Sequence, residues 1–134
     1  MKPGSTILML EDDPDDRFMT EETLKELGYR LPIKFLSYSH ELFNELKKIP
    51  KPVLILIDYH SGPDNAVKIL KQLKSHADYK AIPVIVLSET SPPFFISECY
   101  ALGASSFIIK PSTNEMTKEK IDGFFKYWMK VAEL

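Results

Sequence analysis

The sequence predicts an α/β domain in which a parallel β-sheet is covered by helices on both faces. Five short apolar runs occur along the chain, and several of them are β-branched and carry no alternating polar residue, as is typical of strands buried on both faces. These runs are Thr6–Leu10, Ile33–Leu36, Val53–Ile57, Val84–Leu87 and Phe107–Ile109. Segments with helical periodicity separate the runs, and regular alternation of strands and helices indicates a parallel sheet.

Apolar residues recur at helical spacing in the segments between the strands. The two clearest stripes are Ala66, Ile69, Leu70 and Leu73, and Ile121, Phe124, Phe125 and Trp128. Two weaker stripes are Thr20, Thr23, Leu24 and Leu27, and Leu42, Leu46 and Ile49. Asp13 followed by Pro14 is typical of a helix start, and Gly28 of a helix end. The segment 94–102 is the least periodic, but Gly103 follows it as a stop signal, so we expect a helix there too.

Length and composition favour one globular domain. The chain has 134 residues, of which 44% are hydrophobic and 27% charged, and this is enough for a core without disulfides. No residues are left over for a second domain, so we expect residues 1–134 to form one unit. The net charge of −2 argues against nucleic-acid binding through a basic face. A single cysteine and the lack of a long apolar stretch favour a cytoplasmic protein without a membrane segment.

Four of the apolar runs end directly in polar groups that can carry chemistry. Leu10 is followed by Glu11, Asp12 and Asp13, Ile57 by Asp58, Leu87 by Ser88, and Ile109 by Lys110. In doubly wound sheets, ligands bind beyond the carboxyl ends of the strands, at the point where the strand order reverses. In a sheet of order 2-1-3-4-5 this point lies between the first and third strands, which carry the acidic residues. The sequence therefore predicts one acidic crevice.

The charges in this crevice suggest a metal. Glu11, Asp12 and Asp58 would place three carboxylates together, with Lys110 nearby to offset them. Like carboxylates repel at close range, and a hard cation such as Mg²⁺ removes the conflict. A metal there can also bind phosphate oxygens, to which Ser88 would supply a hydrogen bond and Lys110 a positive charge. Asp58 is then left as the nucleophile that forms an aspartyl phosphate.

Four motifs occur in order along the chain. They are Ile7–Pro14, Leu54–Asp58, Ile82–Ser88 and Ala101–Pro111. In these motifs the sequence resembles the receiver domains of two-component response regulators, relatives of the bacterial chemotaxis regulator, over nearly the whole chain. The resemblance implies a flavodoxin-like (βα)5 three-layer sandwich with a parallel five-stranded sheet in the order 2-1-3-4-5. It also implies that residues 1–134 are a single receiver domain with no output domain.

The resemblance implies roles for the acidic residues. Glu11 and Asp12 correspond to the acidic pair of the family, in which Asp12 would bind Mg²⁺ directly and Glu11 mostly through water. Asp58 corresponds to the phosphoacceptor and is also a metal ligand. His60 would give its backbone carbonyl to the metal.

The resemblance also implies a switch. Ser88 and Lys110 correspond to the hydroxyl and the lysine that contact the phosphoryl group. Phe107 corresponds to the aromatic residue that changes rotamer on activation, so Ser88 and Phe107 would form the switch. A cis bond between Lys110 and Pro111 is implied as well.

For function, the resemblance implies a bacterial signalling protein rather than a classical enzyme. A sensor histidine kinase would transfer its phosphoryl group to Asp58 in a Mg²⁺-dependent reaction, and the chain would catalyse only this transfer and slow autodephosphorylation. The resulting conformational change would act on a downstream effector, a phosphotransfer protein or a second copy of the chain. The contact face would consist of the fourth helix, the fifth strand and the fifth helix.

Some acidic residues also have simpler interpretations. Asp13, Asp15 and Asp16 suit the positive end of a helix, and we expect no catalytic role for them. Glu11 and Asp12 on their own could be a solvated strand end, but Asp58 and Lys110 at matching strand ends favour the metal site.

Two segments depart from the family pattern. The loop Tyr59–Ala66 lacks the Met-Pro-Gly turn that usually follows the phosphoacceptor. The fourth helix begins Ser91–Phe95, where receivers usually carry more polar residues. Phe94 and Phe95 cannot both face inward from a short helix, so one of them could form part of a partner surface.

Two other functions fit parts of the sequence. A pseudo-receiver would bind partners without being phosphorylated, but loss of Asp58, Asp12 or Lys110 would have signalled it, and all three are present. A phosphatase with an aspartyl nucleophile would carry a second acid two residues later, where this chain has His60.

Overall fold

The chain forms a parallel five-stranded sheet with helices on both faces. The computed structural model describes residues 6–29, 32–48, 51–59, 65–89, 92–110 and 114–128. The strands are β1 (Ile7–Leu10), β2 (Ile33–Leu36), β3 (Leu54–Asp58), β4 (Val84–Ser88) and β5 (Ser106–Ile109). They lie in the order β2-β1-β3-β4-β5, and all four neighbouring pairs are parallel. The predicted three-layer sandwich and its strand order are therefore confirmed.

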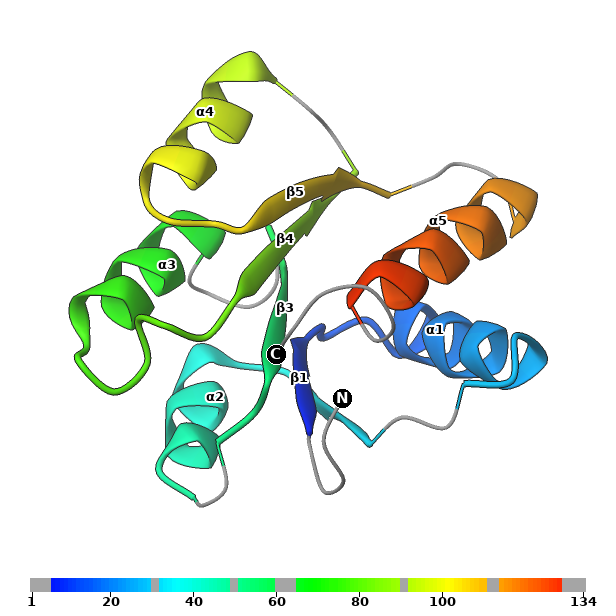
Figure 1. Cartoon of the computed structure of the whole chain (residues 1–134), viewed down its shortest axis with the longest axis horizontal. Helices are drawn as coiled ribbons and strands as arrows, with labels where there is room; N and C mark the ends of the chain where they lie inside the picture. Colours follow the sequence, from blue (N-terminus) through cyan, green and yellow to red (C-terminus); the bar gives the residue numbers. More distant parts are fainter. Residues whose placement is uncertain are drawn as a thin grey trace.

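The helices divide between the two faces of the sheet. They are α1 (Pro14–Glu26), α2 (Ser39–Leu46), α3 (Ala66–Ser75), α4 (Pro93–Ala101) and α5 (Asn114–Lys126). In Figure 1, α1 and α5 lie on one side of the sheet, and α2, α3 and α4 lie on the other. No helix of the described residues is long and apolar enough to span a membrane.

Two apolar cores explain why the central strand β1 carries no alternating polar residues. In β1, Leu8 and Leu10 belong to the core under α2, α3 and α4, whereas Ile7 and Met9 belong to the core under α1 and α5. Successive side chains of a strand point to opposite faces. Both faces of this sheet are covered, so all four of these positions must be apolar.

The register of the strands aligns their carboxyl ends. Leu10 of β1 pairs with Ile57 of β3, so the residues that follow them, Glu11 and Asp58, leave the sheet at the same level. On the other side, β4 and β5 end together, and the backbone N–H of Lys110 donates to the carbonyl of Ser88 at 2.7 Å. The sheet therefore brings the ends of four strands to one edge.

Local signals fix the turn that leads from β1 into α1. Asp13 is the N-cap of α1, and its carboxylate accepts hydrogen bonds from the backbone N–H groups of Asp15 at 2.8 Å and Asp16 at 3.4 Å. Pro14 occupies the first helical position, as the sequence predicts. Gly28 ends the helix with a φ of 81°, a conformation that suits glycine.

Candidate functional site

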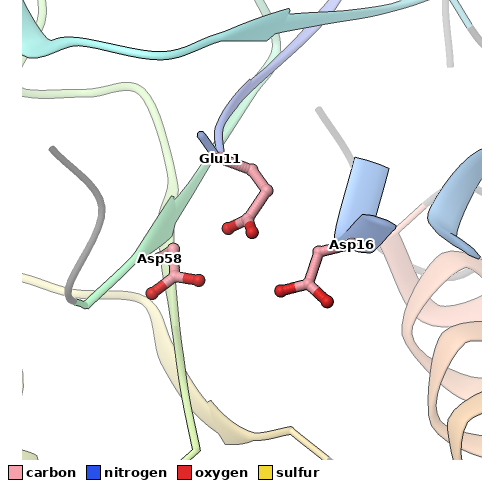
Figure 2. A group of neighbouring side chains, drawn as sticks. All are labelled: Glu11, Asp16 and Asp58. Carbon is pink, nitrogen blue, oxygen red and sulfur yellow. The ribbon is translucent and has the colours of Figure 1, made fainter. Parts of the chain in front are cut away.

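Three carboxylates meet at the carboxyl edge of the sheet. Glu11 follows β1, Asp16 lies in the first turn of α1, and Asp58 is the last residue of β3. Their ligand oxygens all lie within 4.8 Å of one another. Figure 2 shows the three side chains pointing toward a common centre from these elements. This is a donor set of hard oxygen atoms, the type that Mg²⁺ and similar cations prefer.

Lys110 supplies the positive charge at this cluster. Its ammonium group donates hydrogen bonds to Asp58 and, at 3.1 Å, to Asp16. It also lies 3.7 Å from Oε2 of Glu11. Burial would lower the pKa of Lys110, but the hydrogen bond and charge of Asp58, together with Glu11 and Asp16, raise it above its ordinary value. One ammonium group thus faces three carboxyl groups, which leaves an excess of negative charge for a cation.

Glu11 is the most buried member of the cluster, with a relative exposure of 1%. Its Oε2 atom has no hydrogen-bond partner among the described residues. Burial, followed by the neighbouring carboxyl groups of Asp58 and Asp16, raises the pKa of Glu11 to about 9. An orphaned oxygen in such a place is costly unless a ligand meets it. The residues present therefore fit a divalent cation.

The structure brings together most, but not all, of the side chains predicted for the metal site. Glu11, Asp58 and Lys110 meet as expected, whereas Asp12 is exposed and lies outside the group of three carboxylates. Adjacent residues of extended chain point in opposite directions, so the burial of Glu11 is consistent with an outward Asp12. The third carboxylate of this group belongs to Asp16, which was not expected there, and the direct metal contact expected of Asp12 stays a prediction.

Asp16 is the site residue that sequence reasoning missed. It was expected to serve only the positive end of a helix, but it lies in the cluster and pairs with Lys110 at 3.1 Å. The available signal was its position: Pro14 opens the helix, so Asp16 lies in the first turn, directly after the strand end that carries Glu11.

The predicted switch residues lie on the neighbouring strands β4 and β5. Ser88 ends β4 and is buried. Phe107 of β5 is partly buried and packs against the core under α2, α3 and α4. Its backbone N–H donates to the hydroxyl of Tyr100 on α4 at 3.0 Å. His60 and Pro111 lie outside the described residues, so the expected carbonyl ligand and the expected cis bond stay predictions.

Comparison with known proteins identifies the family. The family described as "Response regulator receiver domain" matches residues 7–122. The chain belongs to the response regulator receiver family. Receiver domains are signalling modules rather than classical enzymes, and the acidic cluster is a feature expected of them.

Individual relatives agree with this assignment. The chain is 25% identical over 138 residues to the response regulator Rcp1 of Synechocystis sp., a match that covers 98% of this chain and 94% of Rcp1. It is 29% identical over 106 residues to the two-component response regulator ORR6 of Oryza sativa subsp. japonica, covering 78% of this chain and 62% of ORR6. Relatives thus occur in plants as well as in bacteria.

Solved structures show the same fold. The Mn²⁺-bound form of Rcp1 superposes with a TM-score of 0.87 at 23% identity, covering 97% of this chain and 98% of that one. The phosphorylated cyanobacterial phytochrome response regulator RcpA gives a TM-score of 0.88 at 24% identity, covering 97% of each chain.

Proposed function

We propose that this receiver domain is a phosphorylation switch in which Asp58 accepts a phosphoryl group from the phosphohistidine of a sensor histidine kinase. The observation that carries the proposal is the arrangement around Asp58. Its carboxylate is partly exposed and accepts a hydrogen bond from Lys110, and the Oε2 atom of Glu11, which has no hydrogen-bond partner among the described residues, lies in the same cluster. This combination supports a nucleophile with a cation and an ammonium group beside it.

In the proposed reaction, a carboxylate oxygen of Asp58 attacks the phosphorus atom of the phosphohistidine. The new O–P bond forms as the P–N bond breaks, and the electron pair returns to the imidazole nitrogen of the kinase. The ammonium group of Lys110, already beside Asp58, would donate to the phosphoryl oxygens, and the hydroxyl of Ser88 would do the same. These contacts stabilise charge on the transferring group.

Glu11, Asp16 and Asp58 would hold a divalent cation, which we propose is Mg²⁺. The carbonyl of His60 is a further proposed ligand, and Asp12 is one only if its exposed side chain turns inward. When bound, the cation would neutralise charge on the phosphoryl oxygens. The Mn²⁺ named for the Rcp1 structure supports a divalent site of this kind.

Phosphorylation would bias the packing around Ser88 and Phe107. A phosphoryl group adds up to about two negative charges and strong acceptor oxygens. These oxygens would attract the hydroxyl of Ser88 and the ammonium group of Lys110. We propose that the change is read on the face made by α4, β5 and α5. The reader would be a protein effector, a phosphotransfer protein or a second copy of the chain.

The test is phosphorylation with a small acyl or amido phosphate, read by intact mass with and without Mg²⁺. We expect one phosphate adduct that requires Mg²⁺ and is absent in Asp58→Asn. Asp78→Asn, which changes an exposed carboxylate after α3, is the matched control and should be phosphorylated normally. A folded wild-type protein that forms no adduct would favour the alternative, a pseudo-receiver that binds partners without phosphorylation.

A further inference from the structure

Arg17 joins the strand end that carries Glu11 to the helix turn that carries Asp16. It follows Asp16 directly in α1 and is partly buried. Its Nε–H donates to the backbone carbonyl of Glu11, and its Nη2 donates to the hydroxyl of Ser37 at 2.7 Å. The guanidinium carbon lies 5.7 Å from the ring centre of Phe35. Three separate contacts therefore fix one side chain.

With the contact from Arg17, both backbone polar groups of Glu11 are hydrogen-bonded. The N–H of Glu11 donates to the carbonyl of Leu36 in the neighbouring strand at 2.9 Å, and Arg17 holds its carbonyl. Oε2 of Glu11 lies 3.7 Å from the ammonium group of Lys110 but has no hydrogen-bond partner among the described residues, so no hydrogen bond to that atom fixes its direction. Its direction depends on how firmly the backbone of Glu11 is held.

We propose that Arg17 is a positioning residue that fixes the Glu11 carboxylate relative to Asp16 and Asp58, and thereby sets the affinity of the site for a divalent cation. The inference rests on the metal site of the proposed function. Arg17 touches neither the cation nor the phosphoryl group and acts through the backbone of Glu11. Supporting groups of this kind orient ligands in many metal sites.

The contacts require arginine rather than any cation. The guanidinium group donates to two different acceptors in a fixed fork and stacks on a ring, whereas an ammonium group is a single point of charge. Lysine at position 17 could reach one of the two acceptors but could not hold both in the same way. Arg17→Lys should therefore fall between the wild type and Arg17→Met.

The experiment measures Mn²⁺ affinity from the EPR signal of the free ion, over a range that reaches saturation in each variant. We expect Arg17→Met to weaken Mn²⁺ binding by about 10-fold, the lower end of the losses seen when a residue that supports a metal ligand is changed. Lys25→Met is the matched control, because Lys25 is an exposed cation on the same helix that pairs with Glu22 at 3.5 Å. It should bind Mn²⁺ like the wild type.

A double-mutant comparison separates positioning from general destabilisation. In a Glu11→Gln background the carboxylate that Arg17 positions is gone, so adding Arg17→Met should have little further effect on Mn²⁺ affinity. An equal loss in both backgrounds, or wild-type affinity in Arg17→Met, would overturn the proposal. If circular dichroism shows that Arg17→Met does not fold, the Mn²⁺ affinities of Arg17→Lys and Ser37→Ala are compared in the two backgrounds instead.

The failure of this inference can be told from the failure of the proposed function. If the wild type binds no Mn²⁺, or binds it as tightly after Glu11→Gln, the metal site itself is refuted. If the wild type binds Mn²⁺ through Glu11 and Arg17 makes no difference, only the positioning role is refuted.

Discussion

Lys110 and Asp16 are 94 residues apart in sequence, yet the Nζ atom of Lys110 lies 3.1 Å from a carboxylate oxygen of Asp16. This pair connects the first turn of α1 to the end of β5 at the acidic cluster. It makes Asp16 part of the site and not only a helix-end charge.

The first prediction concerns Asp16. Asp16→Asn should weaken Mn²⁺ binding by at least about 10-fold, because it removes one of the three clustered carboxylates. Asp15→Asn is the matched control, since Asp15 is exposed in the same helical turn and contributes the same charge to the helix dipole. Equal losses in the two variants, measured by titration, would mean that the helix dipole alone explains Asp16.

The second prediction concerns pH. Burial and neighbouring carboxyl groups raise the pKa of Glu11 in the folded protein to about 9, against 4.5 for an ordinary glutamate. The folded state therefore keeps a proton that the unfolded state loses, so the stability of the metal-free protein should fall as the pH rises between these values. The slope is at most about 1.4 kcal/mol per pH unit for one proton.

Urea unfolding in a chelator, from about pH 6 to about pH 8, measures this slope. Glu11→Gln cannot titrate and should show a flatter profile than the wild type. A cation binds the deprotonated carboxylate, so Mn²⁺ affinity should rise over the same range. Identical pH profiles for the two proteins in chelator would argue against a protonated Glu11.

The third prediction concerns Gly103, which ends α4 with a φ of 103°. A Cβ atom there would lie 3.0 Å from Cγ of Lys74, whose Nζ donates to the carbonyls of Lys80 and Ile82 at 3.0 Å each. Gly103→Ala should cost more than Gly28→Ala, because Gly28 has a similar positive φ but a Cβ atom there would meet no atom of the described residues beyond its chain neighbours within 4 Å. Backbone strain alone costs about 1–2 kcal/mol at each position.

Urea unfolding compares the two glycine variants. Lys74→Ala removes the crowded side-chain atoms, so the excess cost of Gly103→Ala should disappear in that background. An excess that persists there would place its origin in the backbone rather than in Lys74.

The fourth prediction concerns the start of α4. Phe95 is partly buried and stacks on Tyr59, the residue after Asp58, with ring centres 4.9 Å apart, whereas Phe94 is 66% exposed. Phe95→Ala should destabilise the fold by roughly 2–4 kcal/mol, and Phe94→Ala by less than about 0.5 kcal/mol. Urea unfolding of the two variants checks this, and similar losses in both would contradict the described packing.

The sequence predicts the central strands well because a sheet covered on both faces leaves continuous apolar runs in β1, β3 and β4. The predicted run Val53–Ile57 and the observed strand Leu54–Asp58 differ by one residue at each end. The expectation that Phe94 and Phe95 face different ways is also confirmed. These are local properties of burial and helical spacing.

Which of several neighbouring acidic residues lies in the site is harder to predict from the sequence than where the strands are. Glu11, Asp12, Asp13, Asp15 and Asp16 offer five carboxylates within six positions. Which of them face Asp58 depends on how the turn after β1 enters α1, and this turn is fixed by the Asp13 cap and by Arg17. Spacing along the sequence does not specify that path, so Asp16 was missed.

The most direct test of the account identifies the phosphorylated residue itself. Borohydride converts an aspartyl phosphate to homoserine, which peptide mass spectrometry can locate in protein phosphorylated with Mg²⁺ and a small phosphate donor. We predict homoserine at position 58 and unmodified residues at positions 11, 12 and 16. Homoserine at position 12 or 16, with Asp58 unmodified, would contradict the assignment of Asp58 as the phosphoryl acceptor.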